Sequence, residues 1–195
     1  MSFEKIFKQK YILASKSPRR IKLLQQIGLD FISIDTGVKE LNIKEFQPLN
    51  IILTNSKMKA FSVPIIDFTS IIIAADTIVA IDKKILHKPA SKKEAFEFLK
   101  MLSGKEHKVY TGIYVANRKN EKEHFGYEKT NVFFRELSDS EINYYIKYHN
   151  PLDKAGSYGI QDDFGCLFVE KIIGDYYNVV GLPLVKLYKM LLKII

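Results

Sequence analysis

Apolar runs of strand length alternate along this chain with apolar residues at helical spacing, and this alternation predicts an α/β fold. Residues 11–14 form a short apolar run, and Ile21, Leu24 and Ile27 then recur at helical spacing until Gly28. The polar segment between the run and the helix is therefore a loop at which a strand gives way to a helix.

The rest of the pattern extends this order of elements. Further strands are predicted at residues 31–34, 71–75, 109–116, 127–135 and 168–172. Further helices are predicted at residues 49–62, at 91–104, from 138 onward and from 183 onward. The helices that start at Ser91 and Ser138 begin with capping boxes. The strand at 71–75 is nearly continuous in apolar residues, which is typical of a strand covered on both faces, and Asp76 follows at or near its end. Residues 77–81 are expected to continue extended, and the charged residues 82–84 before Ile85 and Leu86 predict a hairpin.

The composition narrows the class of protein. The chain has 195 residues, of which 47% are hydrophobic and 12% aromatic, and it has no low-complexity tract. These values exclude a disordered or fibrous protein. We expect a single domain over residues 1–195, with room for two small lobes that share a cleft.

The distribution of charge and the cysteine content favour a reducing compartment. Residues 1–8 are too frequently charged for the apolar core of a signal peptide, and no stretch reaches the roughly 18 apolar residues of a membrane span. The one cysteine, Cys166, rules out an intrachain disulfide and is expected to be a small buried side chain. We therefore expect a cytoplasmic protein without a membrane partner.

The formal net charge of +8 would suit a polyanionic partner. Most lysines, however, are scattered singly along the predicted helices, where a solvated surface explains them. The sequence contains no helix-turn-helix, RNA-binding aromatic motif or zinc site, so no nucleic-acid partner is expected.

A cluster of basic and hydroxyl residues lies where the first strand gives way to the first helix. Ser17 is the expected N-cap, Pro18 the first helical residue, and Arg19 and Arg20 follow in the first turn. Because a helix N-terminus carries partial positive charge, two arginines there are unfavourable unless an anion binds. Together with free backbone N–H groups they match the oxygens of a polyphosphate. A solvated basic helix start is the alternative, and no Walker-type GxxxxGK[ST] loop is present.

Asp76 is the other candidate for chemistry. It follows five apolar residues, a common position for catalytic or metal-binding carboxylates in open sheets. A solvated aspartate or a cap is the alternative. The four histidines are widely separated and no cluster has the spacing of a zinc site, so oxygen ligands would favour magnesium at any cation site.

Six segments in order resemble the successive motifs of the Maf nucleotide pyrophosphatases. They are YILASKSPRR at 11–20, AADTIV at 74–79, KP at 88–89, LSG at 102–104, DKAGSYGIQ at 153–161 and NVVGLP at 178–183. The resemblance implies an α/β fold of the Maf and inosine-triphosphatase kind, with an elongated mixed sheet, flanking helices and two lobes around a nucleotide cleft. It also implies a homodimer, a divalent cation (Mg²⁺ or Mn²⁺), and hydrolysis of the bond between the α and β phosphates of a nucleoside triphosphate.

The resemblance also assigns roles to single residues. Contacts to the phosphates are implied for Ser17, Arg20, Lys57 and Lys88. Asp76 is implied to be either the proton acceptor that activates water or a ligand of the metal, and Glu40 is implied to help hold the cation. Water would attack the α phosphorus and pyrophosphate would leave, while cations offset the charge of the leaving oxygens.

Within the family, residues 153–161 resemble the branch that acts on dTTP and UTP, whose specificity positions match Arg19, Thr77 and Gln161. A glutamine amide offers a donor and an acceptor, as uracil and thymine do. The chain departs from the family at residues 162–163, two aspartates where glycine is common, which leaves the exact base open. The alternatives are hydrolysis of 7-methyl-GTP or of modified pyrimidine nucleotides, and nucleotide binding without catalysis in a role linked to septum formation.

Overall fold

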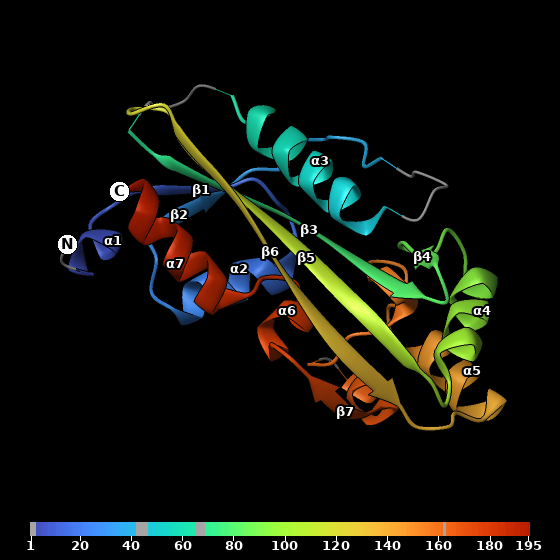
Figure 1. Ribbon diagram of the computed structural model, residues 1–195. Helices are drawn as coiled ribbons and strands as arrows, with labels where there is room; N and C mark the ends of the chain where they lie inside the picture. Colours follow the sequence, from blue (N-terminus) through green and yellow to red (C-terminus); the bar gives the residue numbers. More distant parts are fainter. Residues whose placement is uncertain (1–2, 42–46, 65–68, 162) are drawn as a thin grey trace.

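The structure of the chain is a computed structural model that describes residues 3–41, 47–64, 69–161 and 163–195, with Asp163 described by its backbone alone. One seven-stranded sheet has the order β2-β1-β3-β5-β6-β7, with β4 beside β3. The strands are β1 Tyr11–Leu13, β2 Phe31–Ser33, β3 Ile71–Ile81, β4 Lys84–Leu86, β5 Glu106–Asn117, β6 Lys122–Phe134 and β7 Val169–Ile173. β1 is parallel to β2 and β3, and the other pairs are antiparallel, so the predicted mixed α/β sheet is confirmed. Figure 1 shows the long strands β3, β5 and β6 running across the molecule.

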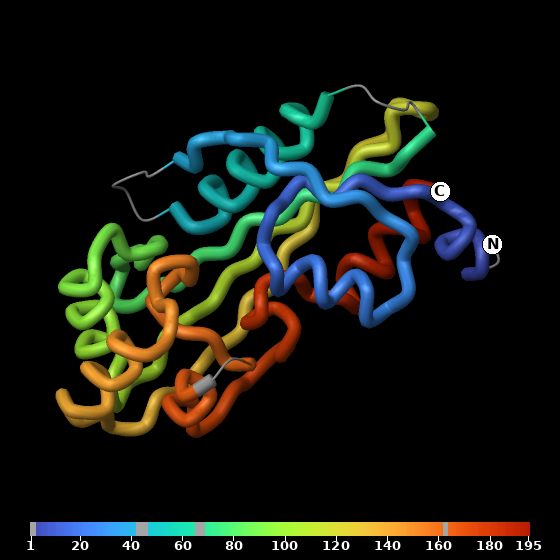
Figure 2. The backbone as a smooth tube through the Cα atoms, turned by 180° about the vertical axis from the view of Figure 1, so that it is seen from behind, coloured from blue at the N-terminus to red at the C-terminus, as the bar shows by residue number. Residues whose placement is uncertain are grey.

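Helices cover both faces of this sheet. They are α1 Glu4–Phe7, α2 Pro18–Gln26, α3 Pro48–Phe61, α4 Lys92–Leu102, α5 Asp139–Tyr148, α6 Tyr176–Val180 and α7 Leu184–Ile194, with the short 3-10 segments η1 Ala155–Ser157 and η2 Asp163–Phe168. α3 lies on one face and α2, α6 and α7 lie on the other, with α4 and α5 at the far end of the sheet (Figure 1). Both termini lie at the opposite end (Figures 1 and 2), where Ile6 and Ile194 pack in one cluster. Among the described residues, none of the helices is long and apolar enough to cross a membrane.

The alternation of side chains along β3 divides the core between the two faces. Ile73 and Ala75 belong to a cluster with α2 and α7. Val79 belongs to a second cluster with α4 and α5. Thr77 lies between these two clusters on the same face, whereas Ala74 packs under α3 on the opposite face. Two hydrophobic clusters therefore lie on this face, one toward each end of β3.

Several details differ from the sequence-based predictions. β3 continues to Ile81, so Asp76 lies in the middle of the strand and not at its end. The strand continues because β5 pairs with it from Ile71 to Ala80. Cys166 is exposed rather than buried, because η2 turns the neighbouring Gly165 inward in its place. The sequence pattern also does not predict the short helices α1 and α6.

One edge of β3 is open in its middle. On the side away from β5, β1 pairs with residues 71–73 and β4 pairs with residues 79–81. Residues 74–78 have no strand partner on this edge within the described part of the chain. Asp76 and Thr77 lie in this gap, and because they are consecutive their side chains point to opposite faces of the sheet. The gap is the feature of the fold that positions the candidate site.

Candidate active site

A cavity of about 690 Å³ opens at the unpaired edge of β3. It is lined by the start of α2, the middle of β3, the end of α6 and several loop segments from both halves of the chain. Six basic and four acidic side chains contribute to the lining. This excess of positive charge favours an anionic ligand.

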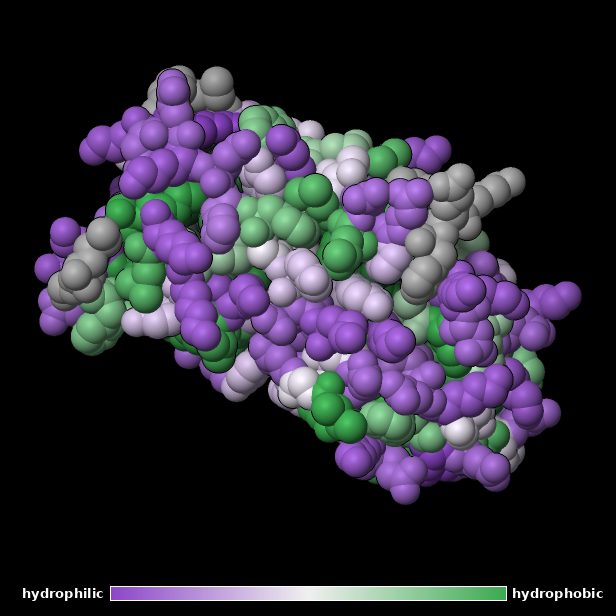
Figure 3. All heavy atoms as spheres, in the orientation of Figure 1, coloured by the Kyte–Doolittle hydropathy of each residue, from purple (hydrophilic) through white to green (hydrophobic). Residues whose placement is uncertain are grey.

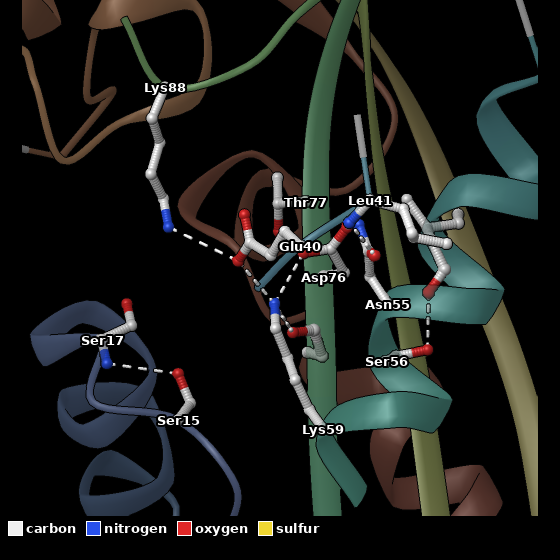
Figure 4. A network of polar contacts seen from close by, with 12 residues as sticks. Ser15, Ser17, Glu40, Leu41, Asn55, Ser56, Lys59, Asp76, Thr77 and Lys88 are labelled. Carbon is white, nitrogen blue, oxygen red and sulfur yellow. Dashed lines mark hydrogen bonds and ion pairs between the residues drawn. The ribbon is translucent and has the colours of Figure 1, made fainter. Parts of the chain in front are cut away.

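Asp76 is buried on the α3 side of the sheet, with its side chain only 5% exposed. Asp76 Oδ1 accepts a hydrogen bond from Lys59 Nζ at 2.7 Å, and Oδ2 accepts one from Asn55 Nδ2 at 2.9 Å (Figure 4). α3 approaches the sheet closely because Gly112, paired with Asp76 on β5, has no side chain; a Cβ there would lie 3.0 Å from Ile52 Cβ. This close packing brings the lysine and the amide to the carboxylate.

Glu40 shares the ammonium group of Lys59 with Asp76. Lys59 Nζ donates to Glu40 Oε1 at 2.7 Å, and Lys88 Nζ lies 3.5 Å from the same oxygen (Figure 4). Burial raises the pKa of Glu40, but Lys59, followed by Lys88 and Arg20, outweighs that effect and lowers the pKa to about 2. The Glu40 carboxylate is therefore ionised at neutral pH.

Glu40 and Asp76 are the two carboxylates that could share a divalent cation. One oxygen of each lies 2.7 Å from Lys59 Nζ, so the ammonium group occupies the point on which these oxygens converge, and a cation would have to bind beside it. Mg²⁺ is usually held by one or two carboxylates together with substrate phosphates. No cluster of three or more His, Cys, Asp or Glu side chains suited to a metal occurs in the described residues, so phosphate oxygens would have to complete the shell.

Arg20 is buried on the opposite face of the sheet. Its Nε donates to the Gly181 carbonyl at 2.9 Å, and its terminal nitrogens donate to Thr77 Oγ1 at 3.0 Å and to Ser15 Oγ at 3.3 Å. Gly181 has a φ of +122°, which residues with a side chain rarely adopt. The turn at this glycine directs its carbonyl oxygen toward Arg20. Burial lowers the pKa of Arg20, and the negative charge of Asp76, which acts to raise it, offsets this only in part. Three oxygen partners thus fix the arginine at the cavity wall.

Arg19 connects the start of α2 to the loop after α5. Its guanidinium nitrogens donate to Asp153 Oδ2 and to the Asp153 carbonyl, both at 2.9 Å. Lys154 Nζ donates to Asp153 Oδ1, also at 2.9 Å. Burial raises the pKa of Asp153, but Lys154 and Arg19 outweigh it and the pKa is lowered. The Arg19 guanidinium is therefore engaged by a carboxylate of its own chain.

Gln161 lines the cavity with an amide that has no hydrogen-bond partner in the part of the chain that the structure describes. Both Nε2 and Oε1 are buried without a hydrogen bond among the described residues, and His87 Nε2, also in the lining, is in the same state. Buried polar atoms are nearly always paired, so these atoms are suited to a ligand's donors and acceptors. Asp162 lies outside the described residues, as does the side chain of Asp163, and the departure from the family at these positions stays without a structural account.

Ser17 is the N-cap of α2, as predicted, but its side chain accepts no capping hydrogen bond. Its backbone N–H donates instead to Ser15 Oγ at 3.2 Å. In Figure 4 the Ser17 hydroxyl points toward the side on which Lys88 and Glu40 lie. The hydroxyl is therefore available at the cavity wall, which Ser17 and Lys88 both line.

The structure does not bring Lys57 to the cavity. Its side chain is 51% exposed, with Nζ 4.0 Å from Glu123 Oε1 and 5.5 Å from the centroid of the Phe61 ring. Two positions along a helix turn a side chain by about 200°, so Lys57 and Lys59 point to opposite sides of α3. Lys59 and Asn55, which sequence reasoning missed, are the α3 residues that reach the site. Their spacing of four residues places both on one face of α3, and the structure identifies that face as the buried one.

Comparison with known proteins gives the family of this chain. The model of the family described as Maf-like protein matches residues 10–194. The dTTP/UTP pyrophosphatase of Carboxydothermus hydrogenoformans is 47% identical over 182 residues, which cover 93% of this chain and 97% of that protein. The dTTP/UTP pyrophosphatase of Thermosipho africanus is 48% identical, with 93% and 92% covered. A solved HAM1 protein from Coxiella burnetii aligns with a TM-score of 0.42 and 13% identity, over 65% of this chain and 73% of that one. Because the family model and these relatives span nearly the whole chain, this protein belongs to the Maf-like family.

Proposed function

We propose that this protein is a nucleoside triphosphate pyrophosphatase that hydrolyses dTTP and UTP to the nucleoside monophosphate and pyrophosphate. The observation that carries the proposal is Asp76, a buried carboxylate held by Lys59 and Asn55 at the edge of a cavity with an excess of basic side chains. The names of the relatives, dTTP/UTP pyrophosphatases at 45–48% identity, support the substrates.

In this proposal Asp76 accepts a proton from a water molecule while the water oxygen attacks the α phosphorus. The bond between that phosphorus and the bridging oxygen breaks, and pyrophosphate leaves with the bonding electron pair. Lys59 and Asn55 keep the carboxylate in one orientation, so no reorganisation is needed when the substrate binds.

We assign the phosphate contacts to Arg20, Lys88 and the Ser17 hydroxyl, together with Lys59 in the place first given to Lys57. Each of these residues lines the cavity, whereas Lys57 does not. Mg²⁺ or Mn²⁺ held by Glu40 and Asp76 would neutralise charge on the phosphate oxygens. Arg20 is already positioned by three oxygens, which reduces the entropy that it would lose on binding phosphate.

We assign recognition of the base to Gln161, because its unpartnered amide offers the donor and acceptor that a pyrimidine ring needs. Thr77 and Arg19 would act on specificity indirectly, since the Thr77 hydroxyl accepts from Arg20 and the Arg19 guanidinium is bonded to Asp153. No observation favours 7-methyl-GTP hydrolysis or binding without catalysis. A cytoplasmic location and a homodimer remain predictions of this proposal.

The proposal is tested by incubating the protein with Mg²⁺ and dTTP, UTP, CTP, GTP or 7-methyl-GTP, and by resolving pyrophosphate from orthophosphate. We expect pyrophosphate from dTTP and UTP, and no turnover by Asp76→Asn with unchanged circular dichroism. The Mn²⁺ affinity of Asp76→Asn tests the metal-binding role by itself, because it should fall if Asp76 is a ligand as well as the proton acceptor, and stay unchanged if Asp76 is the proton acceptor alone. Hydrolysis of 7-methyl-GTP alone, or full activity of the variant, would overturn the assignment.

A further inference from the structure

His87 lies where the open edge of β3 begins, between the strand β4 and Lys88. β4 ends at Leu86, which pairs with Val79 of β3, so His87 is the first residue of this segment beyond the sheet pairing. Its side chain belongs to the lining of the cavity at this edge. His87 has no role in the proposed hydrolysis, although the next residue, Lys88, is one of the proposed phosphate contacts.

The backbone of His87 is joined to the segment that carries Gln161. Its carbonyl oxygen accepts a hydrogen bond from the Gly156 N–H at 3.3 Å. Gly156 has a φ of +66°, and a Cβ there would lie 3.0 Å from Val79 Cγ2, so this segment packs tightly against β3. His87 and residues 155–161 therefore form one continuous part of the cavity wall.

The cavity lining beside this contact is apolar. Hydrophilic residues cover most of the molecular face that Figure 3 shows. The wall near Gly156, in contrast, contains Val79, its strand partner Val109, Ala155 and Tyr158, all from the second hydrophobic cluster. Ligand sites that are lined in this way hold flat apolar rings, whereas a triphosphate needs cations and N–H groups. This part of the cavity therefore suits the base of a nucleotide.

The imidazole of His87 contains a buried nitrogen without a partner. Nε2 makes no hydrogen bond within the described part of the chain, and the same is true of Nε2 and Oε1 of Gln161. Buried polar atoms are nearly always paired in folded proteins. Three such atoms in the lining of one cavity therefore indicate a ligand that brings three polar atoms of its own.

Uracil and thymine present three polar atoms along one edge of the ring. Two carbonyl oxygens, O2 and O4, flank the N3–H donor. One amide pairs with N3–H and with one carbonyl, so Gln161 leaves the second carbonyl without a donor. A neutral imidazole carries one N–H, and with this proton on Nε2 His87 supplies the missing donor.

We propose that His87 is a second base-recognition residue, which donates from Nε2 to the pyrimidine carbonyl that Gln161 leaves free. This inference rests on the proposed function, because it takes the base in the cavity to be uracil or thymine. A ribose hydroxyl is the other uncharged polar group of a nucleotide that could meet Nε2. The apolar wall beside His87 favours the ring over the hydroxylated sugar.

The proposal is tested by His87→Leu and by calorimetric titration. The ligand is a dTTP analogue with an imido group between the α and β phosphates, which cannot be hydrolysed there, so its affinity does not depend on turnover. His87→Leu should raise its dissociation constant about 10-fold, the value of one hydrogen bond to a buried carbonyl. The affinity for inorganic triphosphate, which has no base, should stay unchanged. His87→Gln keeps an N–H donor and should restore most of the affinity for the analogue.

Two controls separate base recognition from a structural role. Since Nε2 has no partner among the described residues, the Tm of His87→Leu should equal or exceed that of wild type. His124→Leu makes the same replacement on β6, outside the cavity, and should leave both affinities unchanged. A lower Tm with equal losses for the analogue and for inorganic triphosphate would show a structural role and overturn the proposal.

Sulfur in place of one carbonyl oxygen identifies the atom that His87 meets, because sulfur is the weaker acceptor. The 2-thio and 4-thio forms of the analogue should both bind wild type less tightly than the parent. For one of them this loss should disappear in His87→Leu, and for the other it should remain. If both losses remain, His87 meets the sugar or the phosphates and the proposal is wrong.

The affinities also separate this inference from the proposed function. Wild-type affinity of His87→Leu for the analogue, in a chain that hydrolyses dTTP, would reject the role of His87 alone. Binding that depends on His87, in a chain that does not hydrolyse dTTP, would reject the proposed hydrolysis alone. No binding of the analogue to wild type at millimolar concentration would overturn the inference.

Discussion

Lys59→Met tests the arrangement of the site most directly. Without the ammonium group, Asp76 would keep only Asn55 in a place where its side chain is 5% exposed, and Glu40 would keep only Lys88, at 3.5 Å. Removing one partner of a buried ion pair costs about 3–5 kcal/mol, because a buried charge loses its compensation. For a chain of this size each kcal/mol lowers Tm by about 2–4 °C, so we expect a decrease of roughly 6–20 °C.

The same substitution two residues earlier on α3 is the matched control. Lys57 is 51% exposed and outside the cavity, so Lys57→Met should change stability by less than about 0.5 kcal/mol and leave hydrolysis of dTTP unchanged. Lys59→Met should lower kcat about 100-fold or more, as expected when a preorganised charge is lost from a site. The measurements are thermal unfolding by calorimetry and initial rates of pyrophosphate release.

If Lys59→Met does not fold, Lys59→Arg keeps the positive charge and allows the same comparison. Its guanidinium is larger and planar, so we expect a folded protein with a lowered kcat. Equal losses in the Lys57 and Lys59 variants would refute the argument from the two sides of α3. Wild-type stability and rate in Lys59→Met would show that Asp76 does not depend on this lysine.

Two further predictions concern the base and the response to pH. Gln161→Ala should lower kcat/KM for dTTP and UTP by about 10- to 100-fold, the value of two lost hydrogen bonds, with less effect on other nucleotides; an unchanged base preference would count against the role of Gln161. The pKa of Glu40 is about 2 in the folded chain, below its ordinary value of about 4.3. Its stabilising effect is therefore complete above about pH 4.3 and is lost as the pH falls through 2. Calorimetry between about pH 5 and 3 should give a smaller loss of Tm in Glu40→Gln than in wild type, and identical losses would contradict the ion-pair network.

The sequence predicts the elements that frame the site wherever local signals are strong. The start of α2 after Ser17 agrees to the residue, because a cap followed by proline is a local signal. The prediction that a strand ends at or near Asp76 was wrong, although the extended conformation up to Ile81 was predicted correctly. Pairing with β5, a contact across the fold, joins the two segments into one strand. The same limit applies to Arg19, whose partner Asp153 lies 134 residues further along the chain.

The lysine of α3 that reaches the cavity could not be chosen from the sequence. Lys57 and Lys59 are equally basic, and a motif match alone does not separate them. The apolar residues of α3 do not form one face, since Leu49 and Phe61 are exposed whereas Asn55 and Lys59 are buried. The packing of α3 on β3 therefore decides which lysine lies in the cavity.

Asp76 and Thr77 are neighbours in the sequence, yet the backbone of β3 separates their surroundings. Asp76 contacts α3 residues, whereas Thr77 contacts Arg20 and Thr111 on the other face. A substitution at Thr77 therefore acts first on Arg20 and Thr111, and leaves in place the hydrogen bonds from Lys59 and Asn55 to the Asp76 carboxylate. The position of the arginine and the orientation of the carboxylate can thus be changed one at a time, although the two residues that control them are consecutive in the chain.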